Sequence, residues 1–337
     1  MMASLGEISS SDTPLLRVEN LVTAFDTEAG LVRAVNDVSF SVRAGSTVGL
    51  VGESGCGKSV TALSIMRLLP KPAGRIIGGS IRLEGVDIAT LAADEMHAIR
   101  GYRISMIFQE PMTALNPVHR IGRQLAEVYQ LHFPEMENGQ IREASIEMLR
   151  KVGIPEPGMR LGEYPHQISG GMRQRVMIAM ALACEPDILI ADEPTTALDV
   201  TIQAQILTVM RDLQRQSGMA IIFITHALGV VAEMCEEVLV MYAGTIMEKG
   251  PAAKLFKQPA HPYTMGLLKS IPRLENPRKI ELSTIRGMVP GLLELPDGCR
   301  FQNRCPYAMP GCVLAPPPMV EVAEGQAAAC YLYPKEQ

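Results

Sequence analysis

The stretch that decides the fold is Gly52-Glu53-Ser54-Gly55-Cys56-Gly57-Lys58-Ser59, which fits the phosphate-loop pattern G-x-x-x-x-G-K-[ST]. Glycines lack a Cβ atom, so successive backbone N–H groups can converge on one anion. Lys58 is placed to reach the β- and γ-phosphates of a nucleotide, and the Ser59 hydroxyl is placed to ligate Mg²⁺. The alternative is a glycine-rich turn that happens to precede Lys-Ser. An apolar run before the loop and a helical pattern after it favour the nucleotide site.

The surrounding sequence predicts an α/β protein with a largely parallel sheet. Uninterrupted Ile, Val and Leu runs alternate with helical segments, which is the pattern of strands buried on both faces. Strands are expected over residues 15–18, 32–35, 47–51, 104–108, 188–191, 221–225 and 238–242. Helices are expected over residues 58–69, 121–131, 141–152, 201–216 and 227–235. The longer polar segments between the two groups of strands indicate a helical subdomain, over about residues 111–185, inserted into the core.

The predicted strand over residues 188–191 ends in two adjacent carboxylates, Asp192 and Glu193. In a phosphate-loop enzyme the first carboxylate holds the Mg²⁺ shell, and the second is placed to orient and deprotonate the attacking water. Such an ending is a weak signal by itself, because many buried strands finish in Asp. The phosphate loop earlier in the chain favours the hydrolytic interpretation.

Composition limits the classes of function. The 337 residues include 47% hydrophobic and 20% charged residues, an ordinary globular profile. The formal net charge of -5 gives no basic surface for a nucleic acid, so no nucleic-acid partner is expected. The longest stretch without Asp, Glu, Lys or Arg, residues 216–232, is too short and too polar for a membrane span. The first residues lack the basic start and apolar run of a secretory signal, and we expect a cytosolic protein.

A further motif, Ile168-Ser169-Gly170-Gly171-Met172-Arg173-Gln174-Arg175, resembles the signature of ATP-binding-cassette (ABC) transporter subunits, and the likeness covers nearly the whole chain. The resemblance implies a RecA-like cassette with an antiparallel β edge and an inserted helical subdomain. Ser169 can cap a helix, and Gly170 and Gly171 expose N–H groups to an anion. By resemblance, residues 169–172 contact the ATP held by an opposite subunit, and Asp199 signals between the paired sites.

Other positions of this family follow in the expected order. Gln109 matches the loop that senses Mg²⁺ or water, and His226 matches the histidine that hydrogen-bonds the γ-phosphate. Ala227 stands where many members have Asp, which leaves the tuning of this loop open. The family also places an aromatic ring on the adenine, for which Phe25 is the candidate. A core or edge-strand phenylalanine is its structural alternative, as a satisfied core or surface histidine is for His226.

The last part of the chain indicates which transporters are most similar. We expect a cassette over residues 1–250 and a small, loop-dominated, Cys- and Pro-rich extension over residues 251–337. Ala260-His261-Pro262-Tyr263-Thr264, Ile271-Pro272 and the segment 287–291 resemble the extension of dipeptide, oligopeptide and nickel importer subunits, the dipeptide-permease type most of all. The resemblance implies an ATPase that drives peptide uptake. Its implied partners are a second ATPase, commonly a paralogue, two membrane permease subunits and, indirectly, an extracytoplasmic solute-binding protein.

The same resemblance places the chain at the cytoplasmic face of a bacterial inner membrane. Nickel or another small solute is the alternative cargo, since the ATPase itself does not touch the solute. Export conflicts with the extension. A soluble ABC ATPase acting on nucleic acid or ribosomes is expected to carry two cassettes or a long coiled-coil insertion, and neither is present.

Four of the seven cysteines gather near the end with the spacing C-x5-C-x6-C-x17-C: Cys299, Cys305, Cys312 and Cys330. In a reducing cytosol such a group suggests metal binding more than disulfides. Four thiolates suit a 4Fe-4S cluster, and zinc ribbons use shorter C-x2-C pairs. Unliganded structural thiols are the alternative. His261 is expected to be part of a packing motif rather than a metal ligand.

Overall fold

Two sheets form the centre of the protein in this computed structural model, which describes residues 13–109, 114–196, 199–271 and 284–333. The larger sheet has the strand order β11-β12-β10-β9-β3-β8-β7-β6. Its strands are β3 (Thr47–Val51), β6 (Ile104–Ile107), β7 (Ile188–Asp192), β8 (Ala220–Ile224), β9 (Glu237–Tyr242), β10 (Thr245–Pro251), β11 (Met319–Ala323) and β12 (Gln326–Ala329). The five strands from β9 to β6 in this order run parallel, and β10, β11 and β12 continue the sheet antiparallel.

The parallel strands explain the apolar runs of the sequence. Every residue of β3, β7 and β8 is buried, as expected for strands covered on both faces. Leu50 of β3 and Asp192 of β7 both lie opposite Ile224 of β8. The carboxyl ends of the three strands therefore meet at one edge of the sheet, where ligands bind in open α/β folds.

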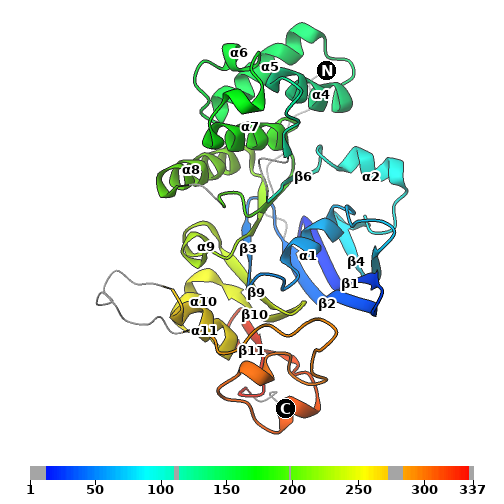
Figure 1. Ribbon diagram of the computed structural model, residues 1–337, viewed down its shortest axis with the longest axis vertical. Helices are drawn as coiled ribbons and strands as arrows, with labels where there is room; N and C mark the ends of the chain where they lie inside the picture. Colours follow the sequence, from blue (N-terminus) through cyan, green and yellow to red (C-terminus); the bar gives the residue numbers. More distant parts are fainter. Residues whose placement is uncertain (1–12, 110–113, 197–198, 272–283, 334–337) are drawn as a thin grey trace.

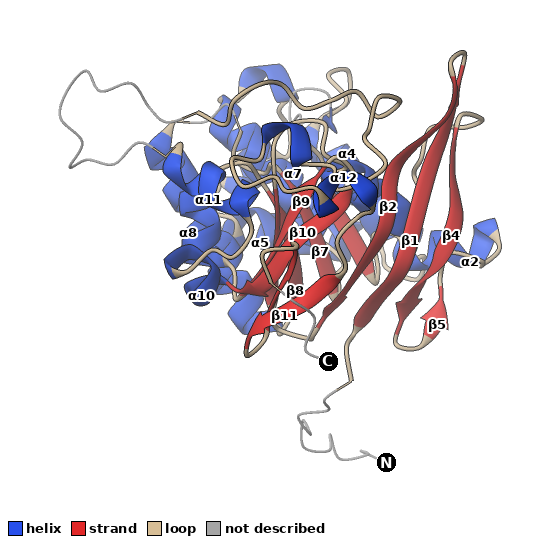
Figure 2. Cartoon of the chain, turned by 90° about the horizontal axis from the view of Figure 1, so that it is seen from below, coloured by secondary structure: helices blue, strands red, loops and turns tan. Residues whose placement is uncertain are grey.

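The smaller sheet is antiparallel and has the order β2-β1-β4-β5. Its strands are β1 (Leu16–Thr27), β2 (Gly30–Val42), β4 (Gly74–Leu83) and β5 (Val86–Asp87). Figure 2 shows β2, β1 and β4 side by side at one flank of the molecule. The antiparallel edge is thus confirmed. The short runs predicted over 15–18 and 32–35 belong to strands that are much longer, because polar residues alternate along their exposed face.

Helices cover the sheets and form a separate group at one end (Figure 1). The group at that end contains α4 (Ile121–His132), α5 (Asn138–Lys151), α6 (Pro157–Arg160) and α7 (Gly170–Leu182). Among the described residues, the cassette also contains the helices α1 (Lys58–Ile65), α2 (Ala93–Ile99), α8 (Val200–Ser217) and α9 (Leu228–Met234). The group forms the helical block expected from the sequence, although residues 110–113 at its predicted start lie outside the described part.

The C-terminal region joins the main sheet instead of standing apart. It contributes α10 (Ala252–Lys257), α11 (Pro262–Lys269), α12 (Gly311–Leu314), β11 and β12, and β12 pairs with β10. The predicted boundary after residue 250 falls inside β10. The expectation of a loop-dominated extension missed these two strands, because short Ala- and Glu-containing segments have weak strand propensity. Pro272, in the predicted Ile271-Pro272 motif, lies outside the described residues.

One buried carboxylate ties this region together. Glu248 of β10 is fully buried and accepts hydrogen bonds from the backbone N–H groups of Ala260 and His261, at 2.9 and 2.8 Å, and from the Gln326 side chain at 2.8 Å. A buried carboxylate persists when donors satisfy it in this way. Within the described ranges, no helix is long and apolar enough to cross a lipid bilayer.

Candidate active site

The phosphate loop connects β3 to α1 in a conformation that requires glycine at two positions. Gly52 has a φ of 151° and Gly57 a φ of 103°. A Cβ atom at Gly52 would lie 2.2 Å from the carbonyl oxygen of Met241, and one at Gly57 would lie 2.7 Å from that of Ala34. The loop therefore passes so close to neighbouring backbone that no side chain fits at either position.

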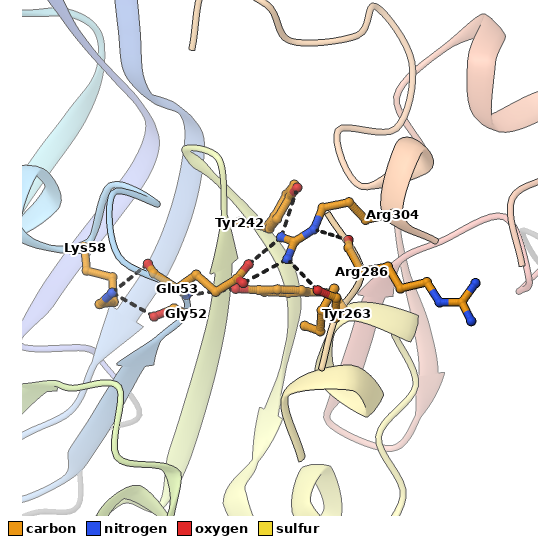
Figure 3. A network of polar contacts seen from close by, with 8 residues as sticks. Gly52, Glu53, Lys58, Tyr242, Tyr263, Arg286 and Arg304 are labelled. Atoms are coloured by element: carbon orange, nitrogen blue, oxygen red, sulfur yellow. Dashed lines mark hydrogen bonds and ion pairs between the residues drawn. The ribbon is translucent and has the colours of Figure 1, made fainter. Parts of the chain in front are cut away.

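Lys58 directs its ammonium group into this loop. The side chain is only 6% exposed, and Nζ donates to the carbonyl oxygens of Gly52 and Glu53 at 2.9 and 3.1 Å (Figure 3). A positive charge enclosed by loop backbone, at the start of a helix, creates an environment that favours an anion such as a phosphate group. The ammonium group of Lys58 thus lies in the loop, and its contact with the β- and γ-phosphates stays a prediction.

Asp192 offers an unused oxygen beside the loop. The residue is 3% exposed, and its Oδ1 atom has no hydrogen-bond partner among the residues that the structure describes. Burial raises the pKa of its carboxyl group, whereas a hydrogen bond from the Ser59 side chain lowers it, and burial outweighs this bond. An unsatisfied buried carboxylate oxygen next to a serine hydroxyl fits Mg²⁺, which takes one or two protein oxygens and completes its shell with water and phosphate.

The three predicted catalytic side chains meet at Glu193. One carboxylate oxygen, Oε2, accepts from the Gln109 amide at 3.3 Å, and the other, Oε1, lies 3.1 Å from Nδ1 of His226. Gln109 and His226 are exposed and Glu193 is partly buried, so the group lies near the surface at the end of the parallel strands. The order of Gln109, Glu193 and His226 in the sequence gave no direct evidence that their side chains are in contact. The structure shows that they are.

A fourth member of this group, Thr196, was missed by sequence reasoning. Its hydroxyl donates to Glu193 Oε2 at 2.8 Å. Burial raises the pKa of the Glu193 carboxyl group, but the hydrogen bonds from Thr196 and His226, together with the charges of His226 and Lys58, outweigh it and leave the pKa below its usual value. Glu193 is therefore ionised and able to accept a proton. A threonine three residues after the carboxylate, in a tight turn, is the local signal that could have indicated it.

The signature residues lie apart from this chain's own phosphate loop. Ser169 caps α7 by accepting a hydrogen bond from the N–H of Met172 at 3.3 Å. Gly170 is exposed, and a Cβ atom there would meet no atom of the described residues within 4 Å. Asp199 caps α8 in the same manner, whereas Ala197 and Leu198 lie outside the described residues. No hydrogen bond between described residues joins Ser169, Gly170 or Gly171 to the loop over 52–59. Their contact with a partner's ATP stays a prediction.

Phe25 lies on β1 and is half-buried. A Cβ atom at Gly74, its partner on β4, would lie 2.9 Å from the Phe25 ring, so the ring packs on that glycine. Because β1 lies between β2 and β4, Phe25 is not on an edge strand, and this contact agrees with a packing role for the ring. Its stacking on the adenine stays a prediction.

The four late cysteines line one small pocket, with His261 and Phe301 among its other walls. Burial raises the pKa of the thiols of Cys299, Cys305 and Cys330. Four thiols match the ligand chemistry of an iron–sulfur cluster. In the part of the chain that the structure describes, however, no three His, Cys, Asp or Glu side chains are grouped so that they could hold a metal ion. The geometry gives the predicted cluster no support beyond the shared pocket.

His261 is buried, and its Nδ1 accepts the N–H of Tyr263 at 3.0 Å, which caps α11. Burial lowers its pKa to about 4, so the ring is neutral at physiological pH. These contacts agree with the predicted packing role of the His-Pro-Tyr motif.

Comparisons with known proteins agree with this geometry. The family described as "ABC transporter" matches residues 35–196, and the family "Oligopeptide/dipeptide transporter, C-terminal region" matches residues 247–312. The oligopeptide transport ATP-binding proteins OppD of Salmonella typhimurium and Escherichia coli are each 54% identical over 317 residues, covering 94% of this chain and 93% of theirs. The protein of the same name from Haemophilus influenzae is 52% identical over 319 residues, covering 95% and 97%.

Solved structures support the same family. A dimeric ATP-binding cassette in a post-hydrolysis state, bound to ADP and phosphate, superimposes with a TM-score of 0.64 at 25% identity, covering 70% of this chain and 98% of its own. A chain of an ABC transporter complex from Clostridium perfringens superimposes with a TM-score of 0.62 at 24% identity, covering 73% and 92%, and shows the fold alone. Together with the phosphate loop and the Glu193 group, these matches show that the chain belongs to the ATP-binding subunits of ABC transporters, of the oligopeptide/dipeptide type.

Proposed function

We propose that this chain hydrolyses ATP to drive the import of di- and oligopeptides through a membrane permease. The observation that carries the hydrolytic part is the contact of Glu193 with Gln109, Thr196 and His226 at the strand edge that also holds the phosphate loop. The peptide part rests on the printed names of relatives that are 52–54% identical over nearly their whole length.

In this mechanism the loop over 52–59 binds the phosphates of ATP, with Lys58 on the β- and γ-phosphates. Ser59 and Asp192, with Gln109, would hold Mg²⁺, which when bound would supply positive charge that offsets the charge of the phosphates. Glu193 accepts a proton from the attacking water, and its lowered pKa keeps it ionised for this role. His226 contacts Glu193 through Nδ1, and by the family resemblance it also hydrogen-bonds the γ-phosphate.

The same proposal requires two ATPase subunits. Ser169, Gly170, Gly171 and Met172 form the exposed start of α7, where N–H groups and the helix dipole favour an anion. Among the described residues of the same chain, no anionic group is seen bound at the start of α7. A second subunit, identical or paralogous, would bring its ATP to this surface, and Asp199 at the start of α8 would lie beside the junction.

By the same family relation, two permease subunits contact the helical group α4–α7 at the cytoplasmic face of the bacterial inner membrane. A solute-binding protein outside the membrane selects the peptide. The finer prediction of a 4Fe-4S cluster is supported only by the shared pocket of its four cysteines. Iron and acid-labile sulfide measured in protein purified without oxygen test it, and a stoichiometry near zero would leave these cysteines as structural thiols.

The test of function is uptake of labelled di- and oligopeptides, with nickel in parallel, in cells that carry either the wild-type chain or Lys58→Ala. Loss of peptide uptake with unchanged nickel entry is the expected result. Loss of nickel entry alone would keep the ATPase and overturn the peptide assignment. Unchanged uptake of both, with Lys58→Ala as the sole copy, would contradict the transport role.

A further inference from the structure

An ion pair joins the C-terminal region to the phosphate loop. Arg304, which precedes Cys305, donates to both carboxylate oxygens of Glu53, Nη1 to Oε2 at 2.6 Å and Nη2 to Oε1 at 3.0 Å (Figure 3). The Arg304 side chain is 5% exposed and that of Glu53 29%. The two residues are 251 positions apart, so only the fold brings them together. A bidentate pair of this kind specifies orientation as well as charge.

The guanidinium group is held on its other sides as well. Its Nε donates to the carbonyl oxygen of Arg286 at 3.0 Å, and its carbon lies 5.7 Å from the centre of the Tyr242 ring. Tyr242 in turn contacts Tyr263, with ring centres 4.8 Å apart. Because these contacts surround the group, Arg304 presents its charge to Glu53 in one orientation.

Tyr263 of the His-Pro-Tyr motif adds a second connection to the same loop residue. Its hydroxyl accepts the backbone N–H of Glu53 at 2.8 Å. The carbonyl oxygen of Glu53 accepts from Lys58. Backbone and side chain of Glu53 are therefore both held by the C-terminal region, while its carbonyl contacts the lysine that is placed to bind phosphate.

The ion pair between Arg304 and Glu53 reduces the repulsion that the Glu53 carboxylate would exert on a bound phosphate. A carboxylate in a loop that binds a polyphosphate would repel it, and the repulsion would act in a partly desolvated site where charges interact strongly. Arg304 neutralises that carboxylate. A buried ion pair is weak evidence for stability, since desolvation offsets most of the attraction. An effect on the anion site explains the pair better than a contribution to folding does.

We propose that Arg304 is a positioning residue of the ATP site, which acts through Glu53 to neutralise and orient the start of the phosphate loop. The inference rests on the proposed ATPase function. It makes ATP affinity depend on the C-terminal region, which lies outside the cassette core. Tyr263 assists by holding the Glu53 backbone.

The experiment measures ATPase rates of the assembled transporter against MgATP concentration for wild type, Arg304→Met, Arg304→Lys, Glu53→Gln and the double variant Glu53→Gln/Arg304→Met. Arg286→Met is the matched control, because it removes an exposed arginine side chain near Arg304 while keeping the backbone carbonyl through which Arg286 contacts Arg304. Thermal unfolding of each complex is followed in parallel.

We expect Arg304→Met to raise the KM for MgATP about tenfold while kcat at saturation stays within about twofold, the usual size for a neighbouring uncompensated charge. Arg304→Lys keeps the positive charge but loses the bidentate contact of the guanidinium group, so its KM should lie between those of wild type and Arg304→Met. The double variant should recover most of the lost affinity, because the repelling carboxylate is gone. Arg286→Met should match wild type.

A purely structural role would instead lower the unfolding temperature and the active fraction with KM unchanged, and this would overturn the proposal. So would a double variant whose KM is no better than that of Arg304→Met. If the complex with Arg304→Met does not assemble, the KM values of Arg304→Lys and of Glu53→Gln/Arg304→Met are compared instead. A double variant whose KM is no better than that of Arg304→Lys would overturn the proposal. A wild-type complex without ATPase activity would contradict the proposed function itself, which separates the two failures.

Discussion

Replacing Glu193 with glutamine tests the proposed general base most sharply. The three side chains that contact Glu193 can each adapt to an amide: the Thr196 hydroxyl rotates, the Gln109 amide flips, and His226 changes tautomer. We therefore expect the fold and the phosphate loop to survive. What is lost is the acceptor of the water's proton, and general-base catalysis contributes about 10²–10⁴-fold, or about 3–5.5 kcal/mol of transition-state stabilisation.

The assay is ATP turnover of the purified complex at saturating MgATP, together with equilibrium binding of ATP. Glu193→Gln should lose about 10²–10⁴-fold in kcat and bind ATP within about threefold of wild type. It should also accumulate as a closed dimer with its partner subunit. A kcat within about threefold of wild type would refute Glu193 as the base. Loss of ATP binding would show that the residue supports the site in another way.

Three further predictions concern single contacts. Thr196→Val removes a hydrogen bond that favours the charged form of Glu193, so the pKa of Glu193 should rise and the acidic limb of the kcat/KM profile should move to higher pH; an unmoved limb would contradict this. Gly170→Asp meets open space in its own chain, so the subunit should fold normally and bind ATP, but the added charge should prevent ATP-dependent pairing, measured by light scattering. Gly52→Ala forces a Cβ atom against the Met241 carbonyl and should lower the free energy of unfolding by about 2–4 kcal/mol in denaturant titration; a loss under about 0.5 kcal/mol would count against the described loop.

The parallel core and the loop that binds phosphate could be predicted from sequence, since both depend on local patterns. The runs over 47–51, 188–191 and 221–225 match β3, β7 and β8 closely, because a continuous apolar run is typical of a strand that is buried on both faces. The Gly-rich β4 carried no such pattern. Its side chains alternate between exposed and half-buried over most of its length, and its pairing with β1 depends on contacts distant in sequence.

In the site too, features set by local patterns could be predicted from sequence, and features set by distant contacts could not. Lys58, Asp192 and Glu193 could be proposed as site residues from sequence because each lies at or after the end of a strand, in a recognisable motif. Thr196 was missed: its place three residues after Glu193 is a local signal, but the contact itself depends on a turn that brings its hydroxyl to Glu193. The ion pair between Arg304 and Glu53 could not be predicted from sequence either, since no local rule relates residues 251 positions apart. Long-range polar contacts of this kind depend on the completed fold and not on propensity.

The most direct measurement of the central claim uses the complete transporter in lipid vesicles with its solute-binding protein, where labelled peptide accumulation and ATP hydrolysis are recorded together. Peptide should raise both rates in parallel for the wild-type chain and neither for Lys58→Ala, while nickel should leave both unchanged. ATP hydrolysis that nickel stimulates and peptide does not, or peptide accumulation that persists with Lys58→Ala, would contradict the account.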